Sequence, residues 1–76
     1  MFITLKEMWK FHNGVHKGEF VNVPAGRHEV ELIPNPRKTS NCSWIVLKGT
    51  DVGLSEGHLR DFADEKYGTS QVIVED

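Results

Sequence analysis

The sequence is poor in cysteine and in long apolar runs. Its 76 residues include one cysteine, Cys42, so no disulfide can form within the chain. Small secreted domains usually carry several cysteines, so we expect a reducing, cytoplasmic location. No apolar run approaches the roughly 20 residues of a membrane-spanning helix, and Lys6 and Glu7 interrupt the apolar stretch that a signal peptide needs. We therefore expect one small globular domain, residues 1–76, with no membrane contact.

Dense positive charge is also missing. The formal net charge is −2, with +2 on residues 1–38 and −4 on residues 39–76. Neither half contains the basic cluster that is typical of a strong nucleic-acid binder. The charged residues are therefore interpreted as ordinary solvated surface.

Motifs for catalysis, phosphate binding and metal binding are incomplete. The glycines on either side of Thr50 lack the Lys-Ser/Thr pair of a phosphate-binding loop. Cys42 lies in neither a nucleophile elbow nor a helix start, which disfavours nucleophilic catalysis. His12 and His16 have the spacing of a zinc pair on a helix, but Asn-Gly between them disfavours a helix, and a Cys-x-x-Cys partner is missing. We expect no enzyme activity, no cofactor and no metal.

Two interpretations of the histidines stay open. A loop could bring His12 and His16 together, with His28 or Cys42 as a third metal ligand. Alternatively, the histidines are surface or half-buried residues. His28 is in phase with Val30, so we expect a packed histidine with one ring nitrogen hydrogen-bonded.

The clearest positive signal is a pair of β-rich runs on either side of Pro24-Ala25-Gly26. Proline presets φ for the first position of a turn, and glycine tolerates the positive φ that closes it. After this turn, His28, Val30 and Leu32 alternate with polar residues as in a half-buried strand. The sequence therefore predicts an antiparallel hairpin that turns at Pro24-Ala25-Gly26.

The other expected elements are short. Residues 2–11 fit either a strand or a helix, and their aromatic and β-branched content favours a strand. The apolar run at residues 43–48, which includes Trp44, predicts a central strand, with residues 52–54 as its partner. Ser55 is a good N-cap for a helix over residues 55–67, and residues 71–74 predict a final strand.

This order of elements predicts a mostly β (α+β) fold. It is expected to be either a small antiparallel sheet or an SH3-like barrel of about five strands, with one helix before the last strand. The likeness to SH3-like barrels rests on turn spacing and implies no function.

The function expected from the sequence is that of a small non-enzymatic binding module. It would act through a protein partner or by homodimerisation, for instance through an edge strand at residues 72–74. The brevity of the chain suits a phage, prophage or bacterial accessory protein. The alternative is a weak nucleic-acid-binding β-barrel that uses an N-terminal aromatic and basic strip. The residues expected to contact a protein partner or nucleic acid are Trp9, Lys10, His12, His16, Lys17, Arg37 and Lys38.

Overall fold

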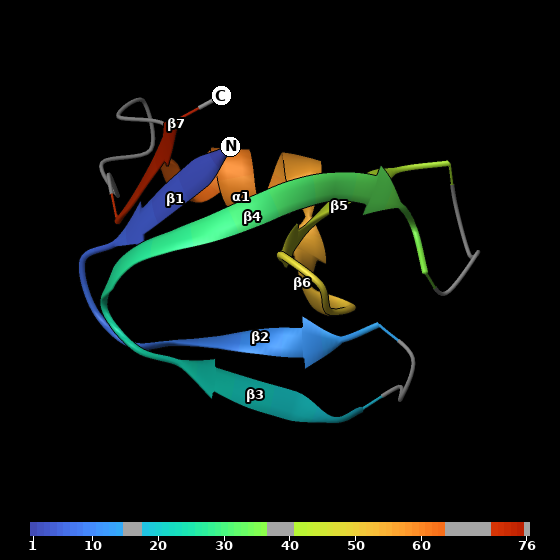
Figure 1. Cartoon of the computed structure of the whole chain (residues 1–76), viewed down its shortest axis with the longest axis horizontal. Helices are drawn as coiled ribbons and strands as arrows, with labels where there is room; N and C mark the ends of the chain where they lie inside the picture. Colours follow the sequence, from blue (N-terminus) through green and yellow to red (C-terminus); the bar gives the residue numbers. More distant parts are fainter. Residues whose placement is uncertain (15–17, 37–40, 64–70, 76) are drawn as a thin grey trace.

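The computed structural model describes residues 1–14, 18–36, 41–63 and 71–75, and within them it has seven strands and one short helix (Figure 1). In chain order these elements are β1 (Phe2–Leu5), β2 (Trp9–Asn13), β3 (Phe20–Val23), β4 (Gly26–Pro34), β5 (Ser43–Leu47), β6 (Val52–Ser55), α1 (Glu56–Ala63) and β7 (Val72–Glu75). All strand pairs are antiparallel, and the helix precedes the last strand. The predicted mostly β fold is therefore confirmed. There are seven strands rather than about five, partly because the N-terminal run is broken after Leu5.

The hairpin predicted at Pro24-Ala25-Gly26 is wrong. Both flanking strands exist, but β3 pairs with β2, and β4 pairs with β1 and β5. The chain instead makes one long hairpin whose arms are β1–β2 and β3–β4, with its turn between Asn13 and Glu19. The connection from β1 to β2 and the connection from β3 to β4 curve side by side at the left of Figure 1. Pro24-Ala25-Gly26 is thus a bend within the second arm.

The two arms of this hairpin are unequal in length at the bend. Leu5 pairs with Gly26, and Trp9 pairs with Val23. Three residues, 6–8, therefore lie opposite only two, Pro24 and Ala25. An extra residue on one strand bends a sheet and increases its twist, as in a β-bulge. Gly26 takes a φ of 125°, a value that L side chains rarely adopt.

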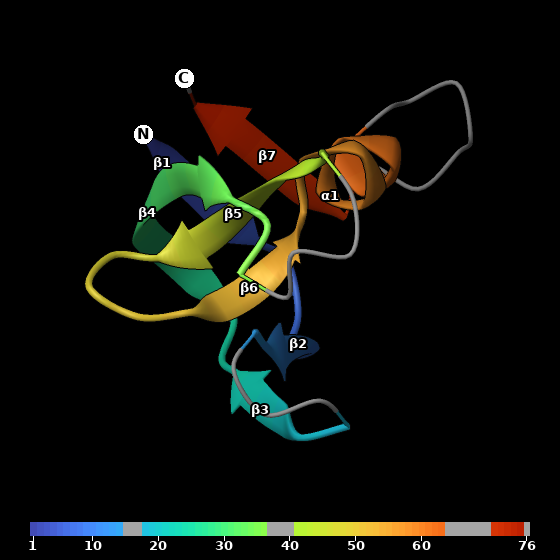
Figure 2. The ribbon, with the colours of Figure 1, turned by 90° about the vertical axis from the view of Figure 1, so that its right-hand side faces the viewer.

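The bend lets the sheet curl so that β6 pairs with both β5 and β2, while β3 and β7 remain its edges. The strand order is β3-β2-β6-β5-β4-β1-β7. β1 continues into β2, and β3 continues into β4. The strands β4, β5, β6, β2 and β3 pair in that order, and β3 then leads back into β4, which completes a circuit. This circuit corresponds to the barrel form of the two that the sequence left open. The hairpin of β2 and β3 extends from the rest of the molecule in Figure 2.

Closure depends on a close approach at Gly53 in β6. Gly53 lies opposite Val46 of β5 on one side and His12 of β2 on the other. A Cβ built on Gly53 would lie 2.0 Å from the carbonyl oxygen of Ile45, far inside van der Waals contact. Only glycine therefore fits between these strands.

The core fills the inside of the curled sheet. It contains Ile3, Leu5, Phe11, Val23, Val30, Ile45, Leu54, Leu59 and Val72. Trp44 and Val46 are also buried, which confirms the prediction that residues 43–48 form a central strand with two buried faces. Leu32 shares a face of β4 with Val30, as predicted, but is 50% exposed near the end of the strand.

The helix begins where the sequence predicts. The amide of His58 donates to Oγ of Ser55 at 3.3 Å, which is an N-cap bond. Leu54 and Leu59 occupy the N′ and N4 positions of a hydrophobic staple, and both are buried. Asp64, Glu65 and Gly68, expected in the last turns and at the helix end, lie outside the described residues.

The close approach at Gly53 predicts a strong effect of one methyl group. G53A should lower the free energy of unfolding by about 1–3 kcal/mol, or prevent folding, because its Cβ meets backbone rather than a movable side chain. G57A is the control, since no atom lies within 4 Å of a Cβ built there and alanine favours helix by up to about 1 kcal/mol. Urea unfolding measures both. An unaffected G53A protein would contradict the position of β6.

The pairing of β2 with β3 predicts which pair of introduced cysteines can form a disulfide. The amide of Asn13 donates to the carbonyl oxygen of Glu19, so Lys10 and Asn22 form a non-hydrogen-bonded pair, with Cα atoms about 4.5 Å apart. In a C42S background, K10C/N22C should therefore oxidise to a disulfide. The control N22C/H28C matches the hairpin expected from the sequence and should stay reduced. Mass spectrometry distinguishes the oxidised from the reduced protein. A disulfide in N22C/H28C but not in K10C/N22C would support the tight hairpin at Pro24-Ala25-Gly26 instead.

Candidate functional site

The predicted binding residues of β2 lie on two different faces. Trp9 and Phe11 point toward the inside of the fold, where Phe11 is fully buried and Trp9 half-buried. Lys10 and His12 alternate with them and point outward. The structure therefore places Trp9 and His12 on opposite faces of β2, while Lys10 borders the same hollow as Trp9.

Trp9 lines an open hollow beside the helix. The hollow has a volume of about 370 Å³. It is lined by Glu7, Met8, Trp9, Lys10, Phe62 and Gln71. The rings of Trp9 and Phe62 meet edge to face with centroids 4.3 Å apart, and His58 packs on Phe62 in the same manner at 4.9 Å. The edge-to-face pair of Trp9 and Phe62 thus forms one side of the site, and His58 packs against Phe62 without lining the hollow.

The lining of the hollow combines apolar and polar side chains. Met8 is 63% exposed, although it is one of the larger apolar side chains in the protein. Glu7 and Lys10 are exposed and bring opposite charges to the rim, and Gln71 brings an amide. Thioethers and aromatic rings adapt to apolar side chains of different shapes. The site can therefore accept an apolar group while its rim hydrogen-bonds to polar neighbours.

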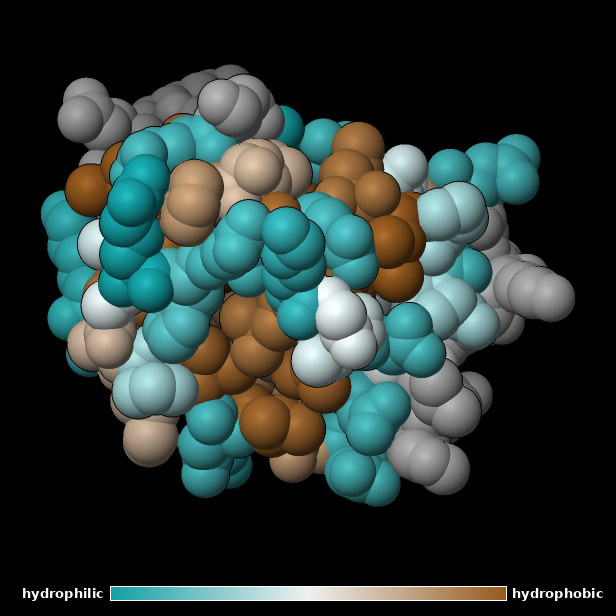
Figure 3. Space-filling model, viewed as in Figure 1, coloured by the Kyte–Doolittle hydropathy of each residue, from teal (hydrophilic) through white to brown (hydrophobic). Residues whose placement is uncertain are grey.

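A second surface covers the outer face of β2 and β3. His12 lies opposite Phe20, with ring centroids 4.9 Å apart and planes inclined by 50°. Phe20 is 55% exposed, and the neighbouring pair Lys10 and Asn22 is exposed as well. This face offers an aromatic platform with a cation beside it. The other, inner face of the hairpin is apolar, and Figure 3 shows brown surface extending toward these strands below a hydrophilic band.

Four of the residues expected to bind a partner lie outside the described residues. They are His16 and Lys17, after β2, and Arg37 and Lys38, after β4. The structure therefore does not describe where they lie relative to the outer face of β2.

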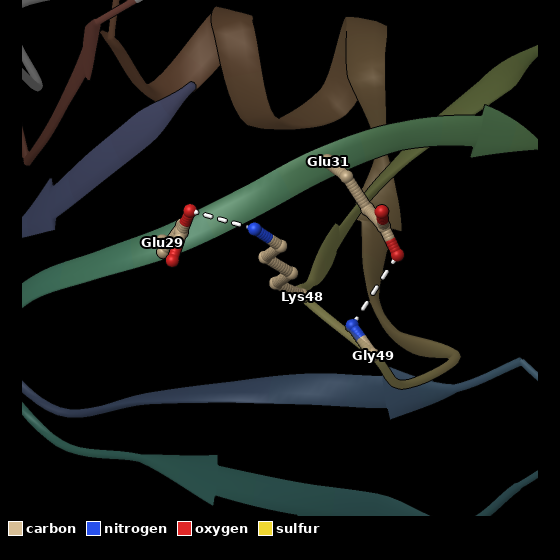
Figure 4. A network of polar contacts seen from close by, with 4 residues as sticks. All are labelled: Glu29, Glu31, Lys48 and Gly49. Carbon is tan, nitrogen blue, oxygen red and sulfur yellow. Dashed lines mark hydrogen bonds and ion pairs between the residues drawn. The ribbon is translucent and has the colours of Figure 1, made fainter.

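Polar contacts on the outer face of β4 stabilise the sheet. Nζ of Lys48 donates to Glu29 at 3.1 Å, and the amide of Gly49 donates to Glu31 at 3.3 Å (Figure 4). Arg27 pairs with Glu75 at 3.1 Å. It also lies 3.9 Å from the ring centroid of Phe2. Exposed ion pairs contribute on the order of 0–1 kcal/mol each. These contacts fasten the turn after β5 and the strand β7 to β4, and we assign them no binding role.

Among the described residues, the remaining side chains that could bind a metal or take part in catalysis do not gather at one place. Over residues 1–14, 18–36, 41–63 and 71–75, no three His, Cys, Asp or Glu side chains are placed to hold a metal ion. Nε2 of His28 lies 2.7 Å from the carbonyl oxygen of Pro24, as expected for a packed histidine. Cys42 is exposed. No helix in the described part of the chain is long and apolar enough to cross a bilayer.

Sequence reasoning missed three residues that shape these surfaces. Phe62 was expected in the apolar stripe of the helix, but its contact with Trp9 joins residues 53 positions apart. Met8 fits a helical stripe in the N-terminal run, whereas the structure places it in the bend. Phe20 belongs to an apolar run that predicts a strand without indicating which face is exposed. Comparison with protein-family models, curated proteins and solved structures finds no match to this chain.

Proposed function

We propose that the protein is a non-enzymatic binding module that acts through a protein partner. The partner inserts an apolar side chain into the hollow between β2 and α1. The observation that supports this is the row of Met8, Trp9 and Phe62 around an open volume of about 370 Å³. Binding pockets have volumes of about 300–1,000 Å³ and are mostly apolar with a few polar groups, and aromatic residues dominate the energetics of protein interfaces.

The charges at the rim favour a peptide over a nucleic acid in this hollow. Glu7 would repel a phosphate backbone, while Lys10 would attract it, so the two largely offset one another. A peptide carries backbone donors and acceptors that can pair with Glu7, Lys10 and Gln71 together. An apolar anchor with a polar backbone on each side therefore matches the site.

Peptide selection tests this proposal. A library of random peptides displayed on phage is selected against the intact protein, and the binders are mapped by amide NMR shifts. We expect shifts at Met8, Trp9 and Phe62, and a loss of affinity of at least about tenfold in M8E, because the new charge must be desolvated on binding. L32E is the matched control, since Leu32 is also half-exposed but lies on β4 away from the hollow. Equal loss in both variants, or shifts elsewhere, would contradict the proposal.

A second candidate function is weak binding of single-stranded nucleic acid on the outer face of β2 and β3. It is supported by Phe20, which is exposed and packed against His12 one pair away from Lys10. Exposed rings stack on bases, and a nearby cation attracts phosphate.

A short single-stranded oligonucleotide at low salt tests the second candidate. We expect amide shifts at Lys10, His12 and Phe20 that fade as salt is added. F20A should weaken binding by about 5–150-fold, because stacking contributes about 1–3 kcal/mol per base. I73A, which removes an exposed apolar side chain on β7, should leave binding unchanged. An unaltered spectrum of the wild-type protein would exclude nucleic acid as the ligand of this face.

A further inference from the structure

The strand β3 is an open edge of the sheet. Its partner in the described residues is β2 alone. The amide of Asn13 donates to the carbonyl oxygen of Glu19, so the hydrogen-bonded pairs with β2 involve residues 19, 21 and 23. Phe20 and Asn22 therefore direct their backbone N–H and C=O groups away from β2. Both residues are exposed.

The other edge strand, β7, is covered where β3 is not. The amide of Lys6 donates to the carbonyl oxygen of Gln71, so Val72 and Val74 direct their backbone groups outward. However, Val72 is only 1% exposed, and the amide of Gln71 donates to the carbonyl oxygen of Phe62 in α1. The helix packs on β7. Residues 72–74, expected to mediate self-association, are thus the better protected edge.

Apart from its shortness, β3 has none of the features that guard an edge strand. Natural edge strands are usually blunted by lysine, proline, a bulge or an inward charge. Phe20, Val21, Asn22 and Val23 include none of these, and Pro24 comes only after the strand ends. This edge can therefore accept another strand.

We propose that β3 pairs in antiparallel fashion with β3 of a second copy of this chain. A two-fold axis normal to the sheet keeps each residue on its own face, so one residue must lie opposite its own copy. With Val21 on the axis, Phe20 lies opposite Asn22 of the second copy, and Asn22 opposite Phe20. All four outward N–H groups then find carbonyl partners.

The neighbouring registers provide fewer hydrogen-bond partners for the outward backbone groups of β3. An axis at Asn22 places Phe20 opposite Pro24, which has no N–H to donate. An axis at Phe20 places Asn22 opposite Gly18, whose φ of 85° belongs to a turn and not to a strand. The register centred on Val21 is therefore the one that this edge favours.

The side chains agree with the same register. Val21 is half-buried on the inner face and would be covered by Val21 of the second copy. On the outer face, the ring of Phe20 lies opposite an asparagine, so no charge opposes a like charge. Glu19 lies opposite Val23. Apolar residues thus meet at the axis, and polar residues remain at the periphery.

The dimer should be weak, because the edge strand is only four residues long, too short to bury the area of a stable interface. We expect a dissociation constant on the order of 0.1–1 mM. Sedimentation velocity and an NMR dilution series measure it on the full chain. The amide shifts of Phe20 and Asn22, whose N–H groups point outward, should move most with concentration. A monomer throughout this range would overturn the proposal.

Two sets of variants locate the interface. N22P removes an outward donor that β2 does not use, so it should keep the fold and abolish the dimer, whereas N22A keeps the donor and should dimerise normally. V21K and V21E should each be monomeric because like charges meet at the axis, and an equimolar mixture should form a heterodimer. Dimerisation of N22P, or no recovery in the mixture, would overturn the proposal. So would an edge that binds only unrelated peptide strands.

This interface is independent of the hollow that supports the proposed function. M8E should leave dimerisation unchanged, and N22P should leave peptide binding in the hollow unchanged. A failure of one proposal is therefore distinguishable from a failure of the other.

Discussion

One extra residue in the first arm of the long hairpin determines much of this structure. Residues 6–8 lie opposite only Pro24 and Ala25, so the hairpin must bend there. The bend carries β2 and β3 away from β1 and β4, and β6 then joins β2 to β5. It also places Met8 and Trp9 at the corner, where Phe62 of α1 can reach them. The barrel-like closure and the hollow thus have a common origin.

Side chains alternate along β2 and β3, so the two faces of this hairpin carry different residues. Inward positions supply Phe11 and Val23 to the core and Trp9 to the hollow. Outward positions supply Lys10, His12 and Phe20 to an exposed face. A shift of register by one residue would exchange the faces, so the pair of Trp9 with Val23 specifies both surfaces at once.

Local signals in the sequence were sufficient for several elements. The Ser55 cap, the apolar run of β5 and the partner strand at residues 52–54 are each indicated by adjacent residues, and all three were predicted. The partner of β3 was not, because Pro24-Ala25-Gly26 fits a tight turn as well as it fits a bend. The pairing of β3 with β2, and of β4 with β1 and β5, decides between them. The contact of Trp9 with Phe62 depends in turn on that pairing, so the hollow could not be predicted either.

The placement of the one described helix explains why the two edges of the sheet differ. The helix α1 follows β6 in the chain and packs on β7. β3 is at the far end of the strand order, and among the described residues no helix adjoins it in the sequence. If two copies joined there, each would still present its own hollow. A partner with two apolar anchors would then bind the second hollow intramolecularly, and such linkage can raise avidity by about 10²–10⁴ without any new contact. A weak edge interface could therefore strengthen binding at a site that it does not touch.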